Sequence, residues 1–162
     1  MSIFDFAMQM EHDGEKFYRT LADNAKNQGL KGILNKLADD EVEHYRVFEK
    51  LKNNTTLDIA SSSILEDSKT IFSEMKIESL QNIGDVEEQK RAYTTALEME
   101  EKSYTFYEDK ASHTDNPDEI KLLKAIAIEE RRHYRLLEGL IDFISRPEQW
   151  IEDAEFVHLT EY

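Results

Sequence analysis

Residues 40–46 read DEVEHYR and residues 129–135 read EERRHYR, so one Glu-x-x-His-Tyr-Arg pattern occurs twice, 89 positions apart. The same shift aligns residues 7–18 and 34–49 with a second copy without a gap, and 12 of these 28 positions are identical. Self-similarity at a fixed spacing indicates a duplicated structural unit. Two such units tend to pack about a pseudo-twofold axis, so residues 89 positions apart are expected to face each other near that axis.

Apolar residues in both copies recur at intervals of three and four, which is the period of an amphipathic helix. The 162 residues include only five Gly and two Pro, and this scarcity of breakers favours an all-α protein. Four long helices are expected, at residues 3–24, 29–53, 86–112 and 117–145. The fourth start is the best marked, with Asn116 as N-cap, Pro117 in the first helical position and Glu119 as the acid of a capping box.

The lengths of the connections predict how these helices are joined. Short loops near residues 27–29 and 113–116 make antiparallel hairpins. The long crossover at residues 54–85 lets the second and third helices run parallel, as in ferritin-like bundles. We therefore expect a ferritin-like four-helix bundle at residues 1–145, built from two similar hairpins. Residues 146–162 are expected to form a short C-terminal tail of the same domain.

Charge and cysteine content exclude several classes of function. Lys and Arg total 20 against 35 Asp and Glu, a net charge of −15, whereas nucleic acids and anionic membranes require cationic surfaces. The chain has no cysteine, which excludes disulfides, thiolate zinc sites, iron–sulfur clusters and rubredoxin-type iron within it. Because neither a signal peptide nor a run of about 18 apolar residues is visible, a cytoplasmic protein is expected.

Each predicted helix carries an acid in the middle of its apolar stripe, and two of them add a histidine one turn later. The six residues are Glu11, Glu41, His44, Glu100, Glu130 and His133. A buried unpaired charge costs several kcal/mol, and these stripes hold too few Lys or Arg to neutralise four carboxylates. Two divalent cations would neutralise them. The pattern therefore predicts a pair of metal ions bound by four Glu and two His.

The spacing Glu-x-x-His is weak evidence when it stands alone, because a solvated helix face can carry it by chance. A third copy, Glu155 with His158, lies outside the apolar stripes and outside the repeat, and we interpret it as coincidence. His12 and His113 are interpreted as surface residues. What favours a metal site is that both other pairs occupy core positions related by the same shift as Glu11 and Glu100.

This combination of motifs resembles the rubrerythrin branch of the ferritin-like superfamily, which are non-haem di-iron carboxylate proteins. The resemblance covers most of the chain. It is carried by AMQME at residues 7–11, FY at 17–18, EVEH at 41–44, Glu100 with Tyr107, ERRH at 130–133 and RPEQW at 146–150.

The resemblance implies a role for each residue. Glu41 and Glu130 would bridge the two metals, while Glu11 with His44 and Glu100 with His133 would complete the two coordination spheres. Tyr18 and Tyr107 would donate hydrogen bonds to carboxylates across the pseudo-twofold axis, and they count with the bridging acids as catalytic residues; ordinary core aromatics are the alternative. Asp40 and Glu129 are candidate acceptors for the imidazole N–H groups; the alternative is that both lie on a solvated edge of the bundle.

Two features depart from the family pattern. Full rubrerythrins usually append a rubredoxin domain, whose cysteines this chain lacks. They also tend to carry a further Glu ligand one turn along the third helix, where this chain has Ser103. Glu98 or Glu101 could replace that ligand if the helix were locally bulged.

The resemblance and the donor set together imply an oxidoreductase that reduces hydrogen peroxide or dioxygen. Two iron ions per chain are expected, with manganese or zinc as alternatives, and electrons would come from an external rubredoxin-like or flavin donor. A ferroxidase or iron-handling protein and a non-catalytic metal-binding bundle are the other candidates. A homodimer is expected, with Trp150 and Phe156 as tail anchors and helix exchange through the crossover left open.

Overall fold

The computed structural model describes residues 2–53 and 85–146, which form four long α-helices and no strand. The helices are α1 (Ile3–Asn24), α2 (Gln28–Lys52), α4 (Val86–Ser112) and α5 (Pro117–Ser145). The expected all-α class is confirmed, and every helix bound agrees with the prediction to within one residue. No helix in the described ranges is long and apolar enough to cross a lipid bilayer. The predicted crossover, apart from Asp85, and the tail beyond Arg146 lie outside the described residues.

A side chain caps the first turn of each helix by accepting hydrogen bonds from backbone N–H groups that have no partner within the helix. The N-caps are Ser2, Asn27, Asp85 and Asn116. Asn116 and Pro117 begin α5 as predicted, but the capping box with Glu119 is wrong. The Asn116 N–H donates instead to the Thr114 hydroxyl, at 3.3 Å, and that hydroxyl donates to the Glu119 carboxylate at 2.7 Å.

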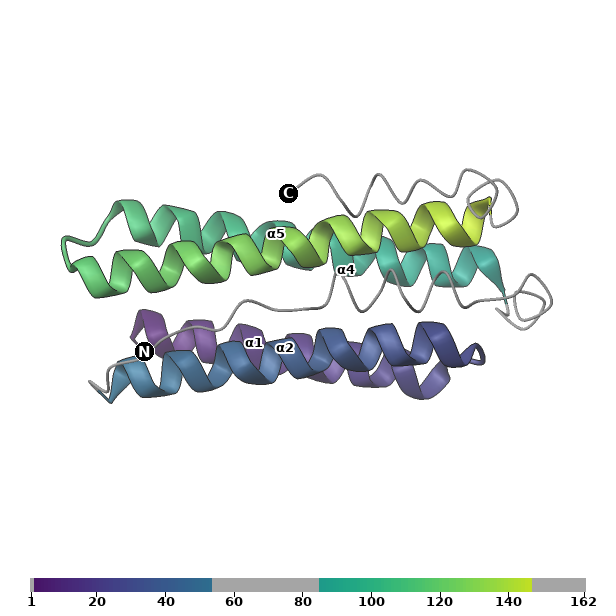
Figure 1. Cartoon of the computed structure of the whole chain (residues 1–162), viewed down its shortest axis with the longest axis horizontal. Helices are drawn as coiled ribbons and strands as arrows, with labels where there is room; N and C mark the ends of the chain where they lie inside the picture. Colours follow the sequence, from purple (N-terminus) through teal and green to yellow (C-terminus); the bar gives the residue numbers. More distant parts are fainter. Residues whose placement is uncertain (1, 54–84, 147–162) are drawn as a thin grey trace.

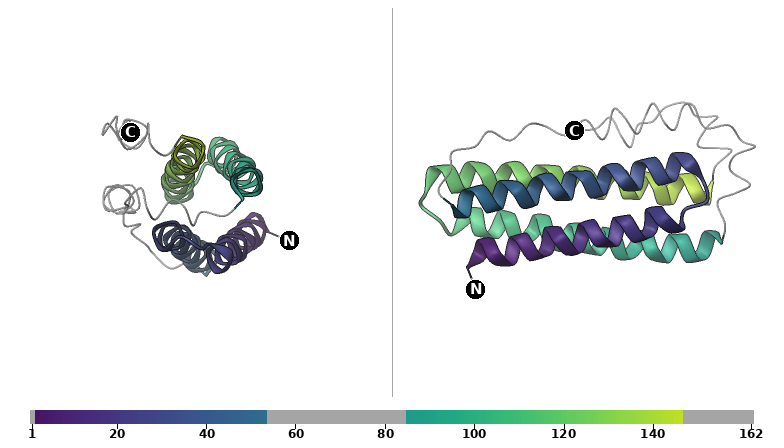
Figure 2. Two further views of the ribbon diagram at one scale, coloured as in Figure 1. Left: turned by 90° about the vertical axis from the view of Figure 1, so that its right-hand side faces the viewer. Right: turned by 90° about the horizontal axis from the view of Figure 1, so that it is seen from below.

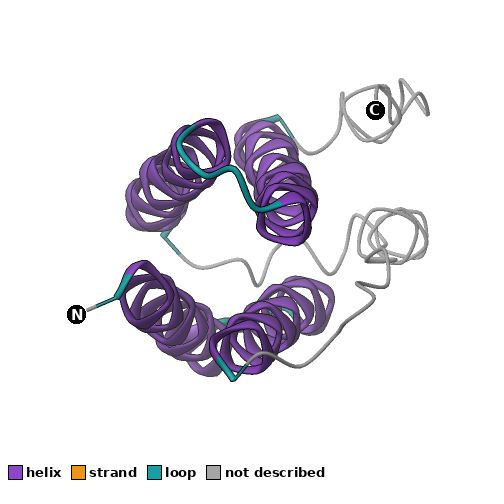
Figure 3. Ribbon diagram, turned by 90° about the vertical axis from the view of Figure 1, so that its left-hand side faces the viewer, coloured by secondary structure: helices purple, strands orange, loops and turns teal. Residues whose placement is uncertain are grey.

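The four helices are arranged as two antiparallel hairpins, α1 with α2 and α4 with α5 (Figure 1). Packing is close within each hairpin, and the hairpins meet through α1 against α4 and α2 against α5. The end-on views show the two hairpins facing each other (Figures 2 and 3), and in Figure 3 the loop between α4 and α5 joins the two helices of one hairpin at the near end. In Figure 1, α2 and α4 run in the same direction. This is the direction that the connectivity of a ferritin-like bundle requires.

The apolar core consists of two clusters, one towards each end of the bundle. The larger contains Tyr18, Ala22, Leu30, Ile33, Leu34, Leu37, Ala38, Tyr93, Ala96, Leu136, Leu137, Leu140, Phe143 and Ile144. The smaller contains Ala7, Val47, Phe48, Tyr107, Ala111, Leu122, Leu123, Ile126 and Ala127. Each cluster includes one tyrosine of the duplicated pair, and buried acids and imidazoles occupy the level between them. The position of the candidate site is therefore the middle layer of the bundle.

Candidate metal centre

All six residues predicted as metal ligands meet in this middle layer. Helices α1 and α4 each supply one glutamate, while α2 and α5 each supply a glutamate and the histidine one turn later. None of the six is more than 4% exposed. They are Glu11, Glu41, His44, Glu100, Glu130 and His133.

The six side chains form two overlapping groups, each with the composition of a metal-binding set. One group is Glu11, Glu41, His44 and Glu130; the other is Glu41, Glu100, Glu130 and His133. Within each group, one potential ligand atom from every residue lies within 4.8 Å of the others. Two of the glutamates, Glu41 and Glu130, belong to both groups. The carboxylates expected to bridge two ions are therefore the ones that the fold makes common to both sites.

The Nδ1 atom of each imidazole points into the layer. His44 Nδ1 lies 3.4 Å from Glu11 Oε2 and 2.6 Å from Glu130 Oε1. His133 Nδ1 lies 3.0 Å from Glu41 Oε1, 3.4 Å from Glu100 Oε1 and 3.9 Å from Glu130 Oε2. Glu130 thus presents one carboxylate oxygen to each imidazole.

Two tyrosines reach across the interface between the hairpins in a reciprocal pair of hydrogen bonds. The Tyr18 hydroxyl, from α1, donates to Glu100 on α4, and the Tyr107 hydroxyl, from α4, donates to Glu11 on α1. Burial raises the pKa of both phenols well above its ordinary value, and the nearby carboxylates raise it further. Each phenol therefore keeps its proton at neutral pH and serves as a hydrogen-bond donor.

Asp40 orients one of the two imidazoles. His133 Nε2 lies 3.0 Å from Asp40 Oδ2. Because an ionised carboxylate only accepts, Nε2 carries a proton, and in the neutral imidazole that a metal would bind, Nδ1 keeps a lone pair directed at the acids. Its counterpart Glu129 is buried and accepts a hydrogen bond from Arg132 at 2.5 Å. The role of Glu129 as an acceptor for His44 stays a prediction.

The two shared carboxylates and the two unshared ones have opposite pKa shifts. Burial raises the pKa of Glu41 and Glu130 well above its ordinary value, and the other carboxylates of the layer raise it further. Burial also raises the pKa of Glu11 and Glu100, but the adjacent imidazoles and tyrosine hydroxyls outweigh it and the net shift is downward. Without a cation, the two shared acids therefore keep their protons to higher pH than the two unshared acids.

Burial lowers the pKa of His133, but the carboxylates of Glu100, Asp40 and Glu41 outweigh it and the net shift is upward. The excess of negative charge in the layer is thus strong enough to hold a proton on a fully buried imidazole. A divalent cation would relieve the same excess.

Several buried polar atoms of the layer lie close to one another but make no hydrogen bond of acceptable geometry. They are Glu11 Oε2, Glu41 Oε1, His44 Nδ1, Glu130 Oε1 and His133 Nδ1. An unpartnered buried polar atom is costly and rare in a native protein. These five atoms are all carboxylate oxygens or imidazole nitrogens, which are donors that iron, manganese and zinc accept. The residues present therefore fit a bound metal.

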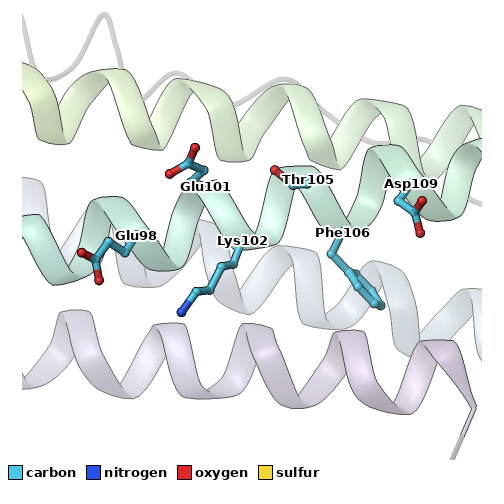
Figure 4. A pocket seen from close by; sticks show the side chains of 6 residues that line it. All are labelled: Glu98, Glu101, Lys102, Thr105, Phe106 and Asp109. Carbon is cyan, nitrogen blue, oxygen red and sulfur yellow. The ribbon is translucent and has the colours of Figure 1, made fainter.

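The acids considered as replacements for the missing ligand at Ser103 do not join the layer. Glu98 and Glu101 are exposed and line an open pocket on the surface of α4, beside Lys102 (Figure 4). Helix α4 is α-helical throughout, without the bulge that would turn either side chain inward. The possibility that they act as ligands is therefore wrong for this structure. His12 and His113 also lie outside the layer, with side chains 45% and 70% exposed.

One residue of the site was not predicted from the sequence. Gly14 is buried in α1, one turn after Glu11, and a Cβ atom there would lie 2.9 Å from Glu41 Oε2. The available signal was its position in the apolar stripe, where the shift of 89 places Ser103 in the second copy. The missing side chain makes room for a carboxylate.

Comparison with known proteins agrees with this geometry. The rubrerythrin family model matches residues 2–141, a range that contains all six acids and imidazoles of the layer. No curated protein and no solved structure matches the chain. A buried cluster of four carboxylates and two imidazoles, compatible with a metal site, thus lies within a match that covers most of the sequence. The chain belongs to the rubrerythrin family.

Proposed function

We propose that this chain is a non-haem di-iron oxidoreductase that reduces hydrogen peroxide or dioxygen with electrons from an external donor. The observation that carries the proposal is the position of Glu130, which directs Oε1 to His44 and Oε2 to His133. A carboxylate that faces two separate imidazoles supports a bridged pair of ions rather than one. Membership of the rubrerythrin family supports iron as the metal and redox chemistry as the activity.

The ligand assignment follows the two overlapping groups. Glu41 and Glu130, which belong to both groups, would be the residues shared by the two ions. Glu11 with His44 would hold one ion, and Glu100 with His133 would hold the other. Carboxylate and imidazole donors suit iron, and manganese or zinc would find the same donors acceptable.

Two bound ferrous ions would supply the two electrons that, with two protons, convert one hydrogen peroxide to two waters. The protein residues supply the setting for this reaction. Tyr18 and Tyr107 hold the two unshared carboxylates in place by hydrogen bonds. Asp40 keeps the lone pair of His133 Nδ1 directed inward. The apolar clusters on both sides of the layer limit the access of bulk water.

The electron donor and the assembly belong to the same proposal. We propose that a rubredoxin-like or flavin-containing partner returns electrons to the oxidised site, since these 162 residues contain no cysteine to hold a rubredoxin-type iron. We further propose a homodimer. Light scattering would distinguish it from the many-subunit shell that a ferritin-type iron store requires.

The first test is the metal content of protein purified from iron-supplemented cells. About two iron ions per chain are expected, falling to near zero in the double variant Glu41→Ala/Glu130→Ala. The same substitution at Glu49 and Glu138, exposed residues also 89 positions apart, should leave the iron content unchanged.

The second test is stopped-flow absorbance of the ferrous protein mixed with peroxide or with dioxygen. Oxidation by stoichiometric peroxide, followed by re-reduction by the donor, would support the proposed reaction. Faster oxidation by dioxygen, with turnover of added ferrous ion, would instead identify a ferroxidase. A bound metal that neither oxidant changes would identify a non-catalytic metal-binding bundle.

A further inference from the structure

Gly14 brings the backbone of α1 against the carboxylate of Glu41. The glycine is buried in the interior of α1, and an added Cβ would meet Glu41 Oε2 at 2.9 Å, Cδ at 3.3 Å and Cγ at 3.5 Å. Real Cβ atoms essentially never lie 2.9 Å from such an atom, so Glu41 occupies space that any other residue at position 14 would fill.

The two oxygens of Glu41 face different parts of the layer. Oε1 lies 3.0 Å from His133 Nδ1, on the side of the Glu100–His133 group. Oε2 lies against α1, the helix that supplies Glu11 to the other group. With an alanine at position 14, Glu41 would have to shift Oε2 away from α1, the helix that carries Glu11.

The corresponding place in the other hairpin is filled differently. The shift of 89 pairs Gly14 with Ser103, which is partly buried on α4. The two copies therefore differ at the position one turn after their unshared glutamates: α1 has a glycine there, without a side chain, whereas α4 has a serine.

A glycine inside a helix is unfavourable relative to alanine. It gives the unfolded chain more conformational freedom to lose on folding, and it adds no side-chain contact to the helix. Nothing in the helical role of α1 requires a glycine at this position, and the carboxylate contact accounts for it.

We infer that Gly14 is a positioning residue that allows Glu41 to bridge two metal ions, so that its replacement selectively weakens the ion held by Glu11 and His44. This inference rests on the proposed function, since it requires two ions.

The test is calorimetric titration of the metal-free full-length protein with Co²⁺, using the parent, Gly14→Ala and two controls. Gly32→Ala makes the same substitution in the interior of α2. Ser103→Ala alters the corresponding residue of α4 without adding an atom. The thermal midpoint of each metal-free protein is measured in parallel.

We expect the parent and both controls to bind two Co²⁺ per chain. Gly14→Ala should bind one Co²⁺ with parental affinity and the second about 10- to 100-fold more weakly, the loss typical when the support of a metal ligand is removed. Its metal-free thermal midpoint should stay at or rise above that of the parent, as in Gly32→Ala, because the end of the Glu41 side chain can move aside. Weakened metal binding in a variant that is no less stable separates positioning from a structural role.

Two unchanged affinities in Gly14→Ala would overturn the inference, as would an equal loss at both sites accompanied by a lower thermal midpoint. A parent that binds no Co²⁺ would refute the proposed function, and the inference with it. A parent that binds two ions beside an unaffected Gly14→Ala would refute the inference alone.

Discussion

Replacing both shared acids by glutamine should stabilise the metal-free protein while abolishing metal binding. Burial and the neighbouring carboxylates raise the pKa of Glu41 and Glu130 well above 4.5. Without metal, both side chains therefore keep their protons to higher pH in the fold than in the unfolded chain, which releases them as the pH passes 4.5. Glutamine has nearly the same shape as the protonated acid and has no proton to lose.

The pH dependence follows from this difference in bound protons. Above pH 4.5 the folded state holds more protons than the unfolded chain, so the stability of the metal-free parent falls as the pH rises. Each carboxyl that stays protonated in the fold lowers the free energy of unfolding by about 1.4 kcal/mol for each pH unit. Two such carboxyls lower it by about 4 kcal/mol at most between about pH 5 and 6.5. The raised pKa of His133 adds a loss of the same sign only above pH 6.5. The lowered pKa values of Glu11 and Glu100 remove stability only below pH 4.5.

The assay is urea unfolding of chelator-treated protein at about pH 5 and 6.5. The free energy of unfolding of the parent should fall across this interval, while that of Glu41→Gln/Glu130→Gln stays nearly constant and exceeds the parent value at pH 6.5. With Co²⁺ present the order should reverse, because only the parent binds the ion. The control is Glu49→Gln/Glu138→Gln, the same change at exposed positions of α2 and α5. A metal-free parent that becomes more stable from pH 5 to 6.5 would refute the reasoning.

Three further substitutions test other contacts of the site and core. Asp40→Asn should weaken the binding of one Co²⁺ ion about 10- to 100-fold, because the His133 N–H loses its ionised acceptor. Titration curves equal to those of the parent would exclude this role of Asp40. Tyr107→Phe removes the buried donor to Glu11 and should lower the free energy of unfolding of the metal-free protein by about 1–3 kcal/mol in urea at pH 7; a variant as stable as the parent would contradict it. Leu140→Ala, within the larger apolar cluster, should cost about 2–5 kcal/mol but leave the Co²⁺ stoichiometry at the parental value; a lower stoichiometry would show that the layer depends on that cluster.

The helices were predictable because their signals are local. Periodicity and capping residues act within one or two turns, and the start of α5 at Asn116 and Pro117 was predicted correctly. The prediction of a capping box at Glu119 was wrong for an equally local reason. The hydroxyl of Thr114, just before the helix, accepts the hydrogen bond from the Asn116 N–H that the Glu119 carboxylate was expected to accept. Glu98 and Glu101 are a different case. Whether they turned inward depended on a bulge, and α4 is regular.

The sequence by itself determined that four acids and two imidazoles lie at one level of a duplicated helical core, because helical periodicity and a shift of 89 are properties of the chain alone. Only the tertiary structure decided that Glu130 faces both imidazoles, that Asp40 reaches His133 and that Gly14 receives Glu41. These contacts join different helices. Their distances depend on how far apart the helices lie and how each is rotated about its axis, which packing of the whole core sets and no pattern along a single helix contains.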